Sequence, residues 1–360
     1  MGVSLAKVIP ILLSVLIMSA CGGDTRAPSS PSSTPSAPPS ATQSPSTAPT
    51  CPKPGQWCTL APMPTPRTEV AVAVYDRPPV GATIFVIGGF EADGSPSTKV
   101  ETYDTVSGAW TDGPSLPEPR HHAAAVFVDT DLFLIGGFET SFDDPQDTVF
   151  AYNVIEREWE DSTPLPAPRG GHGAAALDGK LYVVGGVGTG RENIADVVVY
   201  PLESVIVGDH AQIALDRQWT TVAPLPTPRD HLAVVALEFR VYAIGGRSGL
   251  DFGRNLSAAE AYEPKTNTWT KIPELPTARS GIAAAPLGHR LFAFGGEGPD
   301  GTFDANEAYV PARGAWQTLP PMPTARHGLG TAVVGDSIYV IAGGPTPGLS
   351  VTGVTEAFTP

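Results

Sequence analysis

Six arginines occupy equivalent places along the chain, each ending a proline-rich stretch such as PLPTPR (Pro224–Arg229). A guanidinium group presents a planar fork of N–H donors that binds a carboxylate at two points. If the six stretches surrounded one axis, the arginines would ring one mouth of a central channel and attract acidic ligands. Alternatively, each arginine pairs with a carboxylate or carbonyls of its own repeat, and six identical occurrences favour this interpretation. The six candidates are Arg67, Arg120, Arg169, Arg229, Arg279 and Arg326.

The residues that follow these arginines differ between repeats and include five of the seven histidines. Imidazole and carboxylate groups gathered in one pocket could bind a metal ion or transfer protons. Neighbouring residues of an extended strand point to opposite sides, however, so we expect these side chains mainly to hydrogen-bond nearby carbonyls, and we expect no metal or cofactor. The candidate ligand-binding residues here are Glu69, His122, His172 and His231.

Loops of variable length and chemistry follow a second recurrent feature, an apolar run that ends in a glycine doublet. Variable loops on a repeated scaffold are where specificity usually lies. We therefore expect Arg191, Arg247 and Arg254 to contribute to a ligand site on the face that carries the loops. None of the acidic loops has the spacing of a calcium-binding loop.

The apolar runs define the elements that must position these residues. Five runs begin 12 residues after an arginine, as Leu132 follows Arg120, and the sixth doublet in this register is Ala342-Gly343. Their period is close to fifty residues, and their short β-branched composition predicts strands rather than helices. Each unit also has a strand that ends in an aromatic residue and a later strand with tryptophan, as in Tyr103 and Trp110. The pattern predicts four antiparallel strands per unit.

The positions of the six tryptophans predict how the array ends. The last unit has no tryptophan of its own, whereas Trp57 precedes the first unit and is followed by TLAPMPTPR, much as Trp316 is followed by QTLPPMPTAR. The N-terminal strand around Trp57 must then complete the last unit, which closes the array into a ring. A ring of four-stranded sheets is a β-propeller, here with six blades and an all-β fold. Blade three carries an insertion at residues 201–218.

Glycine doublets, a tyrosine and then a tryptophan at fifty-residue spacing resemble the kelch repeat. The likeness extends from about residue 55 to the end of the chain. Four units also have the family's glutamate two residues before the aromatic position, namely Glu101, Glu260, Glu307 and Glu356, while Phe150 and Val198 replace it in the others. The resemblance implies a six-bladed kelch propeller over residues 51–360.

The first fifty residues predict export and anchoring. Residues 1–20 have a cation followed by a short apolar run, as a signal peptide does. Met18-Ser19-Ala20-Cys21 resembles the lipobox of bacterial lipoproteins, which implies a lipid on Cys21 and an extracytoplasmic location. Residues 21–50, rich in Pro, Ser and Thr, predict a disordered stalk. Beyond it, Cys51 and Cys58 can form a disulfide in this compartment.

A formal net charge of −15 argues against a nucleic-acid partner. No nucleophile elbow, phosphate loop or zinc signature occurs, so a non-enzymatic role is favoured. We expect a monomeric, membrane-tethered recognition module that binds a protein or carbohydrate at the channel mouth. The alternative is a sugar-active enzyme similar to the sialic acid mutarotases, which are six-bladed kelch proteins. In that case the arginines would hold an acidic sugar while His and Glu transfer protons.

Overall fold

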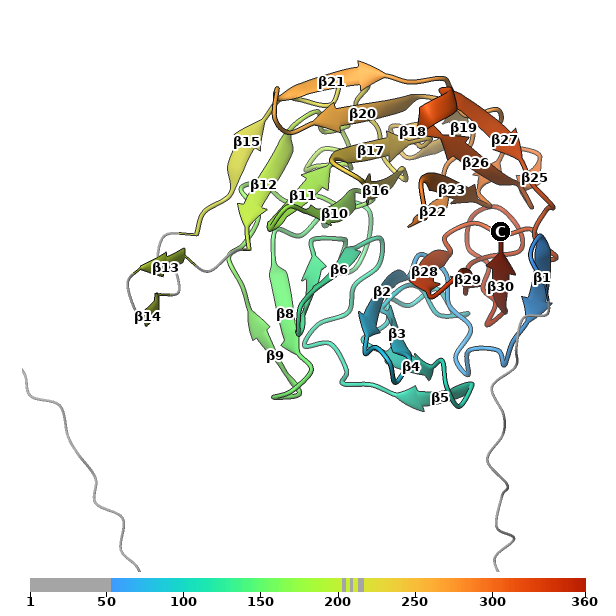
Figure 1. Ribbon diagram of the computed structural model, residues 1–360, viewed down its shortest axis with the longest axis horizontal. Helices are drawn as coiled ribbons and strands as arrows, with labels where there is room; N and C mark the ends of the chain where they lie inside the picture. The colour runs from blue at the N-terminus through green and yellow to red at the C-terminus, as the bar shows by residue number, and fades with distance from the viewer. Residues whose placement is uncertain (1–52, 203–204, 208–209, 213–216) are drawn as a thin grey trace, which may run out of the picture. The chain divides into compact units, whose positions relative to one another are not determined.

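The computed structural model describes residues 53–360 except 203–204, 208–209 and 213–216, and these described residues form a six-bladed propeller (Figure 1). The predicted signal peptide, Cys21, the stalk and Cys51 lie outside the described residues, and the disulfide between Cys51 and Cys58 therefore stays a prediction. Within the described part, no helix is long and apolar enough to cross a membrane.

Each blade is a four-stranded antiparallel sheet whose strands follow one another outward from the channel. Blade one contains β2 (Ala71–Asp76), β3 (Ala82–Ile87), β4 (Val100–Asp104) and β5 (Ala109–Asp112). Blade two contains β6 (Ala124–Val128), β7 (Asp131–Ile135), β8 (Val149–Asn153) and β9 (Glu158–Asp161). Blade three contains β10 (Gly173–Leu177), β11 (Lys180–Val184), β12 (Val197–Pro201) and β15 (Thr220–Val222).

Blade four contains β16 (Ala233–Leu237), β17 (Arg240–Ile244), β20 (Ala259–Glu263) and β21 (Thr268–Lys271). Blade five contains β22 (Ala283–Leu287), β23 (Arg290–Phe294), β26 (Asn306–Val310) and β27 (Ala315–Thr318). Blade six contains β28 (Gly330–Val334), β29 (Ser337–Ile341), β30 (Thr355–Thr359) and β1 (Gln56–Thr59). A short 3₁₀ helix, η1 (Pro311–Arg313), joins two outer strands of blade five.

Three two-stranded hairpins extend the connections. The insertion of blade three forms β13 (Val205–Val207) and β14 (His210–Gln212). The loop after the doublet of blade four forms β18 (Arg247–Ser248) and β19 (Asp251–Asn255). The corresponding loop of blade five forms β24 (Glu297–Gly298) and β25 (Gly301–Thr302).

The predicted closure of the ring is confirmed. Strand β1 pairs with β30, with Trp57 opposite Phe358, so the N-terminal strand is the outer strand of the last blade (Figure 1). The innermost strands β2 and β28 also contact each other, as the innermost strands of all other neighbouring blades do. Every tryptophan donates its indole N–H to a carbonyl that follows the outer strand of the preceding blade, and Trp57 joins this series through Pro320. Each seam is therefore fastened in the same way.

The glycine doublets form a circle of hydrogen bonds around the channel. The second doublet residue of each blade donates its N–H to the carbonyl of the arginine in the next blade, from Gly89 to Arg120 onward, and Gly343 closes the circle on Arg67. A Cβ atom on Gly88 would lie 2.2 Å from the carbonyl oxygen of Arg120, which explains the glycine at this position of blade one. Ala342 and Gly343 have φ of 62° and 101°, so the predicted register of the sixth doublet is confirmed.

A second circle joins the residues that lie two positions after each arginine. The N–H of each donates to the carbonyl of its counterpart in the preceding blade, and the N–H of Glu69 closes the ring on Gly328. The members of this circle, hereafter the belt, are Glu69, His122, Gly171, His231, Gly281 and Gly328. All six have positive φ, between 51° and 64°.

Buried ion pairs inside the blades should carry more of the stability than exposed ones. Glu260 of β20 accepts a 2.7 Å hydrogen bond from fully buried Arg229, whereas Glu263 of the same strand pairs with exposed Arg240 at 3.3 Å. We expect Glu260→Gln to lower the free energy of unfolding by about 3 kcal/mol, because it leaves a buried guanidinium charge uncompensated. The matched control Glu263→Gln should cost less than about 1 kcal/mol. Equal losses in urea titrations would contradict this assignment.

Candidate functional site

Three positions of the belt carry a side chain where the other three blades have glycine. In blades three, five and six the belt residue is glycine, but Glu69, His122 and His231 adopt the same left-handed conformation at φ of 54°, 54° and 51°. A side chain with a Cβ costs about 1–2 kcal/mol in this conformation relative to glycine. Strained non-glycine residues of this kind are typical of functional sites. Three of them on one circle identify the belt as the place to look for a site.

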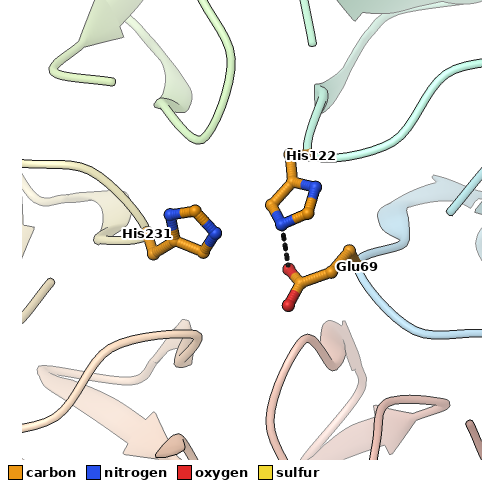
Figure 2. A group of neighbouring side chains, drawn as sticks. All are labelled: Glu69, His122 and His231. Atoms are coloured by element: carbon orange, nitrogen blue, oxygen red, sulfur yellow. Dashed lines mark ion pairs between the residues drawn. The ribbon is translucent and has the colours of Figure 1, made fainter. Parts of the chain in front are cut away.

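Glu69 and His122 are in direct contact. The carboxylate Oε2 of Glu69 lies 3.2 Å from Nε2 of His122, and Figure 2 shows the imidazole of His231 facing this pair. His122 and His231 are also in ring contact, with centroids 4.6 Å apart. The two histidines are buried, while Glu69 keeps 13% of its side chain exposed. Glu69 is therefore the member of the belt that reaches solvent.

Arg247, from β18 of blade four, connects the histidine to two carboxylates. Its Nε lies 3.3 Å from Asp230, its Nη1 2.6 Å from Glu297 and its Nη2 2.7 Å from Nε2 of His231. Nδ1 of His231 lies 2.6 Å from Asp230. Because a guanidinium can only donate, Nε2 of His231 accepts and its Nδ1–H donates to Asp230. The geometry fixes a neutral imidazole.

His327 of blade six completes the cluster. Its Nδ1 lies 3.1 Å from the carbonyl oxygen of Gly344 and donates to it. Its Nε2 lies 3.6 Å from Oε1 of Glu69 and 3.6 Å from Oε2 of Glu297. The same oxygen of Glu297 accepts a 2.9 Å hydrogen bond from the backbone N–H of Gly348. Side chains from five blades thus meet at one point.

Above the cluster lies a cavity of about 330 Å³, hereafter the mouth pocket. Its polar floor includes Glu69, His122, Arg247, Glu297 and His327, and the apolar part of its wall consists of Phe90, Phe142, Leu250, Phe252 and Leu349. A pocket with an apolar wall and a few convergent polar groups is typical of a small-ligand site. A second cavity, of about 260 Å³, follows the channel along the innermost strands.

Two carboxyl groups of the cluster, those of Glu69 and Asp230, have pKa values shifted in opposite directions. Burial, followed by repulsion from Glu297, raises the pKa of Glu69 to about 8. For Asp230, burial acts in the opposite sense to hydrogen bonds from His231 and Asn193 and to the charge of Arg247, and together they lower its pKa to about 2. Burial lowers the pKa of His122 well below its ordinary value. Near neutral pH the Glu69 carboxyl can hold a proton beside a neutral imidazole, an arrangement suited to proton transfer.

The six arginines of the predicted ring are buried within their blades. Four pair with the glutamates of their own repeats, at 2.5 to 3.0 Å: Arg67–Glu101, Arg229–Glu260, Arg279–Glu307 and Arg326–Glu356. Arg120 instead contacts Glu118 at 2.7 Å and lies over the ring of Phe150, while Arg169 donates to the carbonyls of Asp196 and Gly185. These contacts agree with the second interpretation of the arginines, pairing within the repeat.

The other predicted residues separate into four environments. Glu69, His122, His231 and Arg247 meet in the cluster. Arg191 lies on the rim of the mouth pocket, where it forms an exposed two-point ion pair with Asp143 of blade two. His172 is buried along the channel, and Arg254 is exposed on β19.

Asp230, Glu297 and His327 were not among the site residues predicted from the sequence. Asp230 and His327 directly follow their arginines, so a comparison of equivalent positions between repeats could have found them. The expectation that these side chains diverge was wrong for the cluster, because the left-handed belt residue breaks the alternation of an extended strand. His121 and His122 show the effect, since these consecutive residues have Nδ1 atoms 2.6 Å apart.

Comparisons with known proteins agree with this architecture. A model of the KLHDC2/KLHL20/DRC7 kelch-repeats domain matches residues 53–206 and 143–344. Kelch-like protein terF of Aspergillus terreus is 28% identical over 232 residues, which cover 59% of this chain and 49% of that protein. Beta-scruin of Limulus polyphemus is 31% identical over 94 residues, which cover 26% of this chain and 10% of that protein. The chain thus spans about half, or less, of the length of these curated relatives.

A solved structure, that of YjhT, superposes with a TM-score of 0.66 and 18% identity, covering 82% of this chain and 95% of that one. At this identity the similarity shows the fold alone.

The buried imidazole of His172 should make stability depend on pH. Burial lowers its pKa from 6.5 to about 3, so the unfolded chain takes up a proton that the folded chain refuses. The contribution of the His172 imidazole to the free energy of unfolding is present above pH 6.5 and is lost as the pH falls toward 3. We expect the difference in unfolding free energy between wild type and His172→Gln to fall by about 2 kcal/mol between pH 7.5 and 5. The control is His289→Gln, which replaces an imidazole that is 90% exposed. A flat difference for His172→Gln would refute the expectation.

Proposed function

The chain belongs to the kelch-repeat β-propeller family, whose members are generally binding modules, and on that premise we propose that it recognises a glycan at the mouth pocket. The observation that carries the proposal is the convergence of Glu69, His122, His231, Arg247, Glu297 and His327, from five blades, beneath a cavity of about 330 Å³. Positions that fill every blade alike serve the scaffold, whereas these positions differ from blade to blade.

The chemistry of the pocket suits a saccharide. Hydroxyl groups can donate to the carboxylates of Glu69 and Glu297, while Phe142 and Phe252 offer apolar faces for the carbon ring. The volume accommodates a terminal sugar rather than a folded surface. A protein partner would instead contact the exposed loops around the pocket and the insertion of blade three.

A second candidate function is sugar-active catalysis of the mutarotase type, favoured by one observation. Glu69, with a pKa raised to about 8, lies 3.2 Å from the neutral imidazole of His122. Opening a sugar ring needs a proton delivered to the ring oxygen and another removed from the anomeric hydroxyl, and such a pair can exchange both. The arginines of the blades would take no part, because they are buried within their own blades. Faster anomer exchange in NMR spectra of a bound reducing sugar would establish catalysis, and an unchanged rate would exclude it for that sugar.

We expect a thermal-shift and calorimetric screen of neutral and acidic sugars to find a ligand. At one hundred times its Kd, a ligand adds about 2.7 kcal/mol to the free energy of unfolding. Phe142→Ala should weaken binding about tenfold, a loss of about 1.4 kcal/mol of contact. The control Phe239→Ala truncates a side chain that is 63% exposed at the other end of β16 and should leave the affinity unchanged. Equal effects of the two variants, or no ligand in the screen, would count against a glycan site at the mouth.

We also propose that the propeller is tethered outside the cytoplasm through a lipid on Cys21. The support is the sequence alone, in which a signal-like segment ends at Met18-Ser19-Ala20-Cys21 and a Pro/Ser/Thr-rich stretch follows. In a bacterial host the wild-type chain should sediment with membranes, because acyl chains contribute about 0.8 kcal/mol for each buried methylene. Cys21→Ala should move the chain to the soluble fraction. Membrane association that persists in Cys21→Ala would rule out this anchor.

A further inference from the structure

The buried cluster beneath the mouth pocket has more negative than positive charge. Its three carboxylates are Glu69, Asp230 and Glu297, and Arg247 is the one guanidinium that these described residues contact within the cluster. Neutral histidines add no charge, so with all three carboxyl groups ionised, as binding of a cation to Glu69 would require, the formal charge of the cluster is −2. Buried charges are costly unless opposite charges compensate them. A divalent cation would bring the balance to zero.

Three donor atoms of the cluster surround a point with the spacing of metal ligands. Nε2 of His327 lies 3.6 Å from Oε1 of Glu69 and 3.6 Å from Oε2 of Glu297. The three ligand atoms all lie within 4.8 Å of one another. Tetrahedral zinc with bonds of about 2.1 Å separates its ligand atoms by roughly 3.4 Å. The observed separations therefore leave room for an ion at bonding distance.

The surroundings hold these donors in the required orientation. The Nδ1–H of His327 is bound to the carbonyl of Gly344, so Nε2 presents its lone pair to the two carboxylates. Metal-binding histidines almost always donate their other N–H in this manner. A Cβ atom at position 344 would lie 2.6 Å from Cε1 of His327, so glycine there makes room for the imidazole. The N–H of Gly348 fixes the metal-facing oxygen of Glu297.

A neighbouring set of donors is less suitable. Glu69, His122 and His231 also bring one donor atom each to within 4.8 Å of one another, and Figure 2 shows the three side chains turned toward each other. However, Nε2 of His231 accepts a 2.7 Å hydrogen bond from Arg247. An ion there would compete with a guanidinium for the same lone pair.

We propose that Glu69, Glu297 and His327 bind a divalent transition-metal ion, with zinc the best match, and leave its fourth position open to the mouth pocket. One imidazole nitrogen and two carboxylate oxygens are ligands that zinc accepts, and an open fourth position distinguishes a reactive or ligand-binding zinc from a structural one. The inference goes beyond the proposed function, because the ion can be detected with no glycan present.

The test is a titration of the purified full chain with Co²⁺ after treatment with a chelator. We expect one equivalent to bind with the intense visible absorption of tetrahedral cobalt, and Zn²⁺ to displace it, since zinc binds such sites more tightly. Glu297→Gln and His327→Gln should each lower the affinity at least about 100-fold. His231→Gln removes an imidazole of the neighbouring set and should keep one equivalent bound. The matched control is His172→Gln, whose buried imidazole belongs to neither donor set and whose loss should leave the affinity and the spectrum unchanged.

Circular dichroism and melting temperatures in chelator-containing buffer establish that each variant folds. For any variant that does not fold, anomalous scattering from zinc in crystals of the wild-type chain locates the ion directly. An ion between Glu69, Glu297 and His327 supports the proposal. An ion between Glu69, His122 and His231, loss of binding in His231→Gln alone, or no stoichiometric binding would overturn it.

Discussion

The closed belt of six backbone hydrogen bonds around the channel is the constraint on which the site depends. Each belt residue must donate to the preceding blade and accept from the next, and all six adopt left-handed backbone to do so. Glycine meets this requirement without strain, and three blades use it. The other three place Glu69, His122 and His231 there. Because the circle fixes the backbone, these side chains are held in place by the whole propeller rather than by one flexible loop.

The buried arginines connect the blades to this belt. Each guanidinium is held inside its own blade, while its backbone carbonyl accepts the N–H of the doublet glycine from the preceding blade. The residue that the ion pair fixes therefore lies two positions before the belt residue. Identical arginines thus support a circle whose members differ. Glutamates of the same repeat compensate four of the buried guanidinium groups, while Arg120 contacts Glu118 and Arg169 donates to backbone carbonyls.

The repeats made the fold predictable from the sequence, whereas the site was only partly so. Trp57 and the missing tryptophan of the last unit were enough to predict the closing strand, because every seam repeats one contact. Arg247 and Glu297 directly follow their glycine doublets and His327 directly follows Arg326, so the repeat places all three near the mouth, but the distances at which they meet depend on the conformations of their side chains. No repeat pattern encodes those distances. The left-handed backbone at Glu69 and His122 could not be predicted either, because neither residue is the glycine that usually indicates positive φ.

Arg247 shows how the cluster divides its roles. All three of its nitrogen atoms already contact protein groups, namely Asp230, Glu297 and Nε2 of His231, and its side chain is buried. An arginine in this state organises its neighbours instead of capturing a ligand, since each new contact would break an existing one. The groups that can still bind an ion or ligand are Glu69 and His327. Oε1 of Glu69 and Nε2 of His327 lie 3.6 Å apart. Selection of an ion or ligand at the mouth pocket therefore rests on the two groups that the network leaves least satisfied.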